Sequence, residues 1–114
     1  MTMTVRALHT FPERGQDGLE HDRAEVGTGG LVGDRPKRAA VSLVGHDAPA
    51  TRANVVLDVP TAQVESLAGR LVRVGGVLLA VEATGNACPG LYAAVGEPGS
   101  LAVGDAVEVV EEDA

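Results

Sequence analysis

Residues 71–82 read LVRVGGVLLAVE, two short apolar runs on either side of a Gly-Gly step. A two-residue loop of this composition is typical of a β-hairpin. The second run, Val77–Val81, is the most apolar part of the chain, and a short apolar run bounded by turn residues is typical of a buried strand. We therefore predict a hairpin over residues 71–82, with its second strand in the core.

The rest of the chain repeats this pattern of short runs between turn residues. Further strands are predicted at residues 4–9, 24–26, 39–44, 55–57 and 106–109. One short helix is predicted near Pro60, capped by Asp58 or Thr61 and ended by Gly69. Many short strands and a single short helix indicate an all-β protein.

The composition agrees with this fold class. The chain has 114 residues, the size of one domain, and we predict a single domain over residues 1–114. Phe11 and Tyr92 are its only phenylalanine and tyrosine, and it has no tryptophan, so Val, Leu and Ala must build the core. Fifteen glycines and six prolines provide many turns, which favours a small all-β barrel or sandwich over a helical bundle.

The charge of the chain is unevenly distributed. The net charge of −7 argues against a nucleic-acid partner, because contacts to phosphates need a basic surface. Residues 33–57, however, carry a local net charge of +2, from Arg35, Lys37, Arg38 and Arg52 against Asp34 and Asp47. A basic segment in an acidic protein is a candidate site for a small-molecule anion, although a solvated basic loop explains it equally well.

Three further features of the sequence bear on the cellular compartment. A single cysteine cannot form an internal disulfide, which is typical of a reducing compartment. Charged residues throughout the first thirty positions leave no room for the apolar core of a signal peptide. No apolar run approaches the length of a membrane span. We therefore expect a cytoplasmic protein with no membrane partner.

The cysteine lies in residues 85–91, GNACPGL, shortly after the most apolar run. A Pro-Gly step ends regular structure, so Cys88 is predicted where a buried strand gives way to a turn. Its thiolate would be both a nucleophile and a metal ligand. A lone cysteine is also often a small packing residue, and this alternative stays open on these residues alone.

A second candidate site precedes the strand at residues 55–57. Arg52 and Asn54 have the i, i+2 spacing that places two side chains on one face of a strand. A guanidinium beside a carboxamide suits an oxyanion, whereas the alternative is a surface ion-pair residue next to an asparagine that caps a turn. His9, His21 and His46 are far apart in the sequence, so we predict no zinc site.

Six motifs occur in an order that resembles the MOSC family, the domain at the C-terminus of molybdenum cofactor sulfurases. They are Gly30-Leu31-Val32-Gly33-Asp34-Arg35, Val41-Ser42-Leu43, Arg52-x-Asn54, Gly69-x-Leu71-x-x-Val74-Gly75, Cys88-x-x-Leu91 and Val103-Gly104-Asp105-x-Val107. The resemblance extends from about residue 29 to residue 110. It implies a mainly antiparallel, small closed β-barrel with one short helix.

The resemblance also implies a chemistry that involves molybdenum cofactor or sulfur carried on a cysteine. Cys88 would hold a persulfide or bind molybdenum. The pocket for the anionic pterin phosphate would be lined by Gly33, Asp34, Arg35, Lys37, Arg38, Arg52 and Asn54. Pyridoxal phosphate would enter only through a partner sulfurase, so a cysteine desulfurase or a molybdoenzyme is the expected protein partner.

Two functions remain open from the sequence. The first is a molybdenum-cofactor-binding or sulfur-carrier protein, either a cofactor-dependent oxidoreductase or a component of a sulfurtransferase, that uses Cys88. The second is a non-catalytic barrel that binds an anion or docks a partner. An accessible, reactive Cys88 favours the first function, and a buried Cys88 favours the second.

Overall fold

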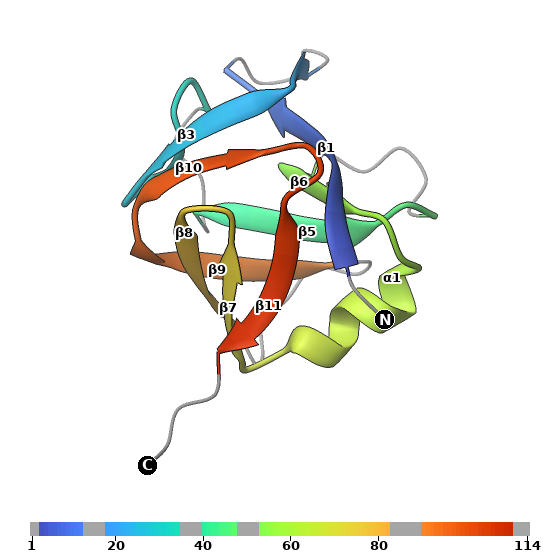
Figure 1. Ribbon diagram of the computed structural model, residues 1–114. Coiled ribbons are helices and arrows are strands. Elements are labelled where there is room, and N and C mark those ends of the chain that lie inside the picture. The colour runs from blue at the N-terminus through green and yellow to red at the C-terminus, as the bar shows by residue number, and fades with distance from the viewer. Residues whose placement is uncertain (1–2, 13–17, 35–39, 48–52, 83–89, 111–114) are drawn as a thin grey trace.

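Figure 1 shows the computed structural model of the chain, which describes residues 3–12, 18–34, 40–47, 53–82 and 90–110. The strands in chain order are β1 (Met3–Thr10), β2 (Leu19–His21), β3 (Arg23–Gly27), β4 (Gly30–Leu31), β5 (Val41–Gly45), β6 (Val55–Leu57), β7 (Leu71–Val74), β8 (Val77–Val81), β9 (Leu91–Glu97), β10 (Gly99–Ala102) and β11 (Ala106–Val110). Helix α1 (Thr61–Val64) continues as the 3-10 turn η1 (Glu65–Leu67) between β6 and β7.

Seven strands form a closed barrel. The order is β11-β7-β8-β9-β5-β6-β1, and β1 pairs with β11 to close the ring, while β2 extends the sheet beyond β1. Every pair is antiparallel except β5 and β6, which run parallel. The predicted small, mainly antiparallel, closed barrel with one short helix is therefore confirmed.

A second, smaller sheet lies against one end of the barrel. Its order is β10-β3-β4, and all its pairs are antiparallel. Figure 1 shows β3 and β10 side by side above the hairpin of β7 and β8. The Gly76 amide of that hairpin donates to Ser100 O of β10 at 2.9 Å, which joins the two sheets.

The predicted hairpin of residues 71–82 is confirmed. Strands β7 and β8 pair from Leu71 opposite Ala80 to Val74 opposite Val77. Alternate residues of β8 are buried, because side chains of a strand point to its two faces in turn. The core of the barrel consists of Val and Leu side chains, among them Val5, Leu8, Val41, Leu43, Val55, Leu57, Val72, Val74, Val77, Leu79 and Leu101.

The predicted helix near Pro60 is present, but its predicted cap is wrong. Neither Asp58 nor Thr61 caps it, since Pro60 occupies the N-cap position without a side-chain hydrogen bond. The Asp47 carboxylate, which follows β5, accepts the Thr61 amide at 2.8 Å instead. A residue distant in sequence thus performs the usual role of a local cap. Within the described part of the chain, no helix has the length and apolar character needed to cross a membrane.

Candidate functional site

Three of the predicted site residues, Gly33, Asp34 and Asn54, belong to the described part of the chain. The others, Arg35, Lys37, Arg38, Arg52 and Cys88, lie outside the described residues. Each of the three segments that carry them is nevertheless adjacent in sequence to a described residue. The described neighbours are Asp34, directly before Arg35; Asn54, two residues after Arg52; and Gly90, two residues after Cys88.

Asn54 lies directly before β6 and is 0% exposed. Its Nδ2 donates to His9 O at 3.2 Å and to Asp34 Oδ2 at 3.1 Å. Its Oδ1 accepts the Ser42 amide at 3.1 Å and the Ser42 hydroxyl at 3.2 Å. The two donors and the acceptor oxygen of the carboxamide therefore connect three segments of the chain.

Ser42 is the partner of Asn54 on β5. Val41 and Leu43 are buried in the core, and Ser42 between them is only half-buried and lies on the opposite face of the strand. Its Oγ accepts the Asn54 backbone amide at 2.9 Å and donates to Asn54 Oδ1. The parallel pairing of β5 with β6, which aligns Leu43 with Val55, places the two polar residues at the same level.

The Asp34 carboxylate connects the turn after β4 to the end of β1. Asp34 N donates to Leu31 O at 3.0 Å, which closes the turn. Asp34 Oδ1 accepts the Phe11 amide at 2.7 Å, and Oδ2 accepts the Asn54 Nδ2. Both carboxylate oxygens thus accept N–H donors, and together they join the turn to the end of β1 and to Asn54.

Gly90 brings the end of the cysteine-bearing segment against β5. Its φ of 111° lies in the region that favours glycine. A Cβ at this position would lie 2.7 Å from both Leu43 O and Val44 Cγ1, so only a residue without a side chain fits here. The other end of the segment is also fixed, because the Glu82 amide donates to Tyr92 O at 2.9 Å.

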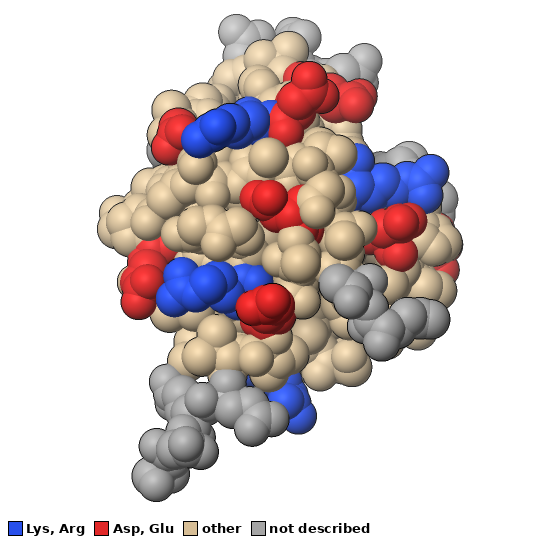
Figure 2. Space-filling view, in the orientation of Figure 1, with Lys and Arg blue, Asp and Glu red and all other residues tan. Residues whose placement is uncertain are grey.

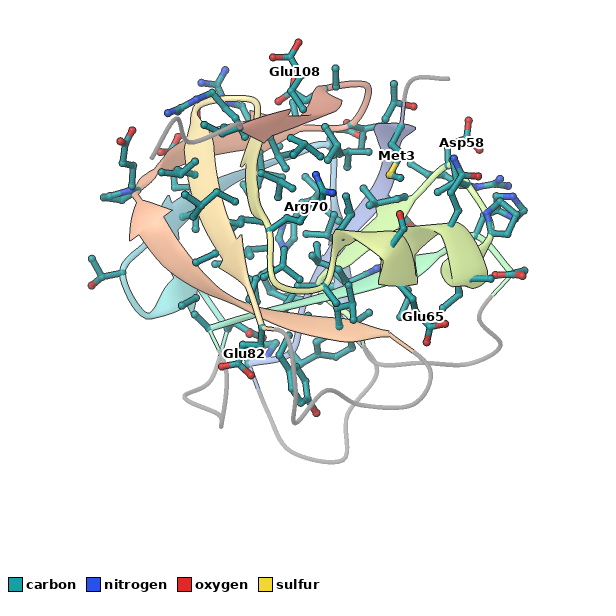
Figure 3. The ribbon with its side chains drawn as sticks, turned by 90° about the horizontal axis from the view of Figure 1, so that it is seen from below. Met3, Asp58, Glu65, Arg70, Glu82 and Glu108 are labelled. Atoms are coloured by element: carbon teal, nitrogen blue, oxygen red, sulfur yellow. The ribbon has the colours of Figure 1, made fainter. Side chains whose placement is uncertain are left out.

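Strand pairing places this region on one side of the barrel. Ser42 pairs with Tyr92 of β9, and Glu82 follows β8 beside it. Figure 3 shows Glu82 on the far side of the barrel from Glu108 of β11. The described neighbours of all three candidate segments therefore meet around β5, which at least two strands separate from β11 in either direction around the barrel.

Charges on another face of the molecule are mixed in sign. Figure 2 shows basic and acidic side chains next to one another over the face that carries β7 and β11. Two exposed ion pairs contribute, Arg6 with Asp58 at 3.5 Å and Arg73 with Glu97 at 3.2 Å. Exposed pairs of this kind stabilise a protein weakly. Among the described residues, this face offers no concentration of positive charge for an anion.

The arrangement around Asn54 suits a scaffold for a binding site. An anion needs donors that are not already used, and both N–H groups of the Asn54 carboxamide have acceptors. The thiol of Cys88 and the predicted basic side chains carry the groups suited to a metal and a phosphate. Ser42 was not among the predicted site residues, although its polarity between two core residues of β5 was a usable signal.

No protein-family model and no curated protein sequence matches the chain. Its fold is nevertheless similar to solved structures. The YuaD protein from Bacillus subtilis has a TM-score of 0.77 at 17% identity, over 99% of this chain and 98% of that protein. YiiM from Escherichia coli has a TM-score of 0.71 at 17% identity, over 100% of this chain and 72% of that protein. A crystal structure titled only as a hypothetical protein has a TM-score of 0.75 at 17% identity, over 98% of this chain and 70% of that one.

These similarities concern the fold, since the identities are low. YuaD and YiiM are MOSC-domain proteins, and their structures cover essentially all of this chain. The architecture that the sequence motifs implied is therefore the one observed: the chain has a MOSC-like barrel fold.

Proposed function

We propose that this protein binds molybdenum cofactor or carries sulfur as a persulfide on Cys88. One observation carries the proposal. Asp34, Asn54 and Gly90, which adjoin the basic segments and the cysteine in sequence, are joined around β5 by hydrogen bonds and close packing. These three described residues, far apart in the sequence, thus share one region of the MOSC-like barrel, which supports a common site.

The chemistry of the side chains of Cys88 and the four basic residues fits molybdenum cofactor or a persulfide. A cysteine thiolate is a suitable soft ligand for a metal and a suitable acceptor for sulfur. Arg35, Lys37, Arg38 and Arg52 supply the cations that a pterin phosphate needs. When bound, the cofactor would supply molybdenum redox chemistry, and Cys88 would hold the metal while the basic side chains hold the phosphate.

The sulfur-carrier form of the proposal needs a donor. The Cys88 thiolate would attack the outer sulfur of a persulfide on a partner cysteine desulfurase, and the partner's thiolate would leave. One S–S bond breaks on the partner and one forms on Cys88, so the step needs no external oxidant. Pyridoxal phosphate belongs to the partner in this scheme, and a molybdoenzyme would receive the sulfur.

The role of Arg52 provides the first test. A charge-assisted contact from a guanidinium to a phosphate oxygen is worth roughly 1.5–3 kcal/mol. We therefore expect Arg52→Ala to weaken the binding of inorganic phosphate or molybdate by about tenfold or more, as measured by calorimetric titration. The control is Arg73→Ala, which removes an exposed arginine that pairs with Glu97. Equal affinities for wild type and Arg52→Ala would remove Arg52 from the site.

A further inference from the structure

The burial of Asn54 limits what it can do at a binding site. The residue is 0% exposed, and its carboxamide donates to His9 O and Asp34 Oδ2. A ligand could reach these N–H groups only if the existing hydrogen bonds broke. Both acceptors are partly buried, and an acceptor that loses its donor in such a place is destabilising, so direct contact of Asn54 with a ligand is unfavourable.

The orientation of the Asn54 side chain is also determined by its neighbours. His9 O can only accept a hydrogen bond, and the Ser42 amide can only donate one. A flipped carboxamide would place its oxygen against His9 O and its Nδ2 against the Ser42 amide. The observed orientation is therefore the one that presents a donor to Asp34.

Ser42 reinforces this orientation through two hydrogen bonds to one residue. Its hydroxyl accepts the Asn54 backbone amide at 2.9 Å and donates to the Asn54 side-chain oxygen at 3.2 Å. The reciprocal pair holds both the main chain and the side chain of Asn54 against β5. A hydrogen-bond path then runs from Ser42 through Asn54 to Asp34, and from Asp34 Oδ1 to the Phe11 amide at 2.7 Å.

We infer that Ser42, Asn54 and Asp34 form a positioning relay, which holds the turn before Arg35 and the chain after Arg52 in a fixed relation to β5. In this role Asn54 and Asp34 position the groups that bind the anion and do not contact the anion themselves. The inference rests on the proposed function, because it assigns the relay to that same anion site. Ser42 belongs to the Val41-Ser42-Leu43 motif but was not among the residues predicted to line the site.

Local hydrogen exchange tests the relay without a ligand. Ser42→Ala removes the hydroxyl, and Asn54→Asp replaces the donor that faces Asp34 with an acceptor. In both variants the Phe11 amide should exchange roughly tenfold faster, the effect of losing about one buried hydrogen bond. The Val5 amide donates to Asp105 O, which directly precedes β11. Its exchange rate reports on the rest of the barrel and should increase less.

Two further variants serve as controls. Ser42→Thr keeps a hydroxyl and suits a strand, so it should restore slow exchange at Phe11. Ser66→Ala removes an exposed hydroxyl that donates to Gln63 O at 2.6 Å, and it should leave the exchange of the Phe11 amide unchanged. If Phe11 and Val5 respond equally to Ser42→Ala, the relay has no local effect and the inference is wrong.

Titration with inorganic phosphate then connects the relay to the site. We expect Ser42→Ala to weaken phosphate binding by about fivefold or more, the equivalent of one hydrogen bond, and Ser42→Thr to restore it. If Ser42→Ala binds phosphate with wild-type affinity although its Phe11 amide exchanges faster, the positioning role is wrong and the proposed anion site is unaffected. Absence of phosphate and molybdate binding in the wild type would contradict the proposed anion site, and the exchange data would still decide whether the relay couples these residues.

Discussion

Asp47 illustrates how one residue couples two elements of the barrel. Its Oδ1 accepts both the Thr61 backbone amide at 2.8 Å and the Thr61 hydroxyl at 2.9 Å. The Thr61 Oγ1 in turn accepts the Gly45 amide at 3.0 Å. The hydrogen bonds from Thr61, the backbone amide first, lower the pKa of Asp47 below its ordinary value. The ionised carboxylate therefore stabilises the junction between β5 and α1.

This lowered pKa predicts the pH dependence of stability. Because the pKa of Asp47 is lower in the folded chain than in the unfolded one, its contribution is present above the unfolded pKa of about 4 and is lost as the pH falls through the folded value. We expect Asp47→Asn to be less stable than wild type near pH 6. The difference should shrink as the pH falls toward 3, as measured by urea unfolding at a series of pH values. A difference that stays constant with pH would contradict this role.

At the scale of the elements, the packing of α1 on β5 depends on the absence of a side chain at Gly45. A Cβ at this position would overlap with Val59 O and Thr61 N, so the chain before the helix lies directly on the strand. The His46 amide donates to Val59 O at 3.0 Å and fixes the same contact. Since the overlapping atoms belong to the backbone, side-chain rotation cannot relieve the overlap.

We therefore expect Gly45→Ala to lower the free energy of unfolding by about 1–3 kcal/mol, the usual cost of overpacking. Gly27→Ala is the matched control, because Gly27 is also in a strand and a Cβ there would meet nothing within 4 Å. This control should be neutral or slightly stabilising. Denaturant unfolding compares the two variants, and equal stabilities would show that α1 moves freely away from β5.

At the scale of the whole molecule, the barrel closes by contacts between the two ends of the described chain. Met3 pairs with Val107, and the Val5 amide donates to Asp105 O at 2.9 Å. Closure removes the open edges that a sheet would otherwise expose. The other end of β1 reaches the region around Asn54, where sequence-distant segments meet, because His9 O accepts the Asn54 carboxamide.

Local patterns explain which elements were predictable. The β7–β8 hairpin was predicted because its two strands and its turn are contiguous in the sequence. Strands β9 and β10 were not predicted, since Ala93, Ala94 and Gly96 give β9 little apolar contrast between its faces. The predicted cap of α1 was wrong because the residue that accepts the Thr61 amide, Asp47, is fourteen residues away in the sequence.

Contacts between distant residues explain what was missed at the candidate site. The sequence motifs indicated Asp34 and Asn54, but their mutual hydrogen bond spans twenty residues. The parallel pairing of β5 with β6, which brings Ser42 to Asn54, has no local signal. A motif can therefore indicate which residues belong to a site. Only the three-dimensional pairing distinguishes a residue that binds a ligand from one that positions other site residues.

The central claim, that Cys88 carries molybdenum cofactor or sulfur, is tested most directly by native mass spectrometry. The chain would be purified from a host that makes the cofactor and a cysteine desulfurase, alongside Cys88→Ala. We predict that the wild type carries the additional mass of the cofactor or of one sulfur atom, and that Cys88→Ala carries neither. A wild-type chain with only its own mass would contradict the account and leave a barrel without this chemistry.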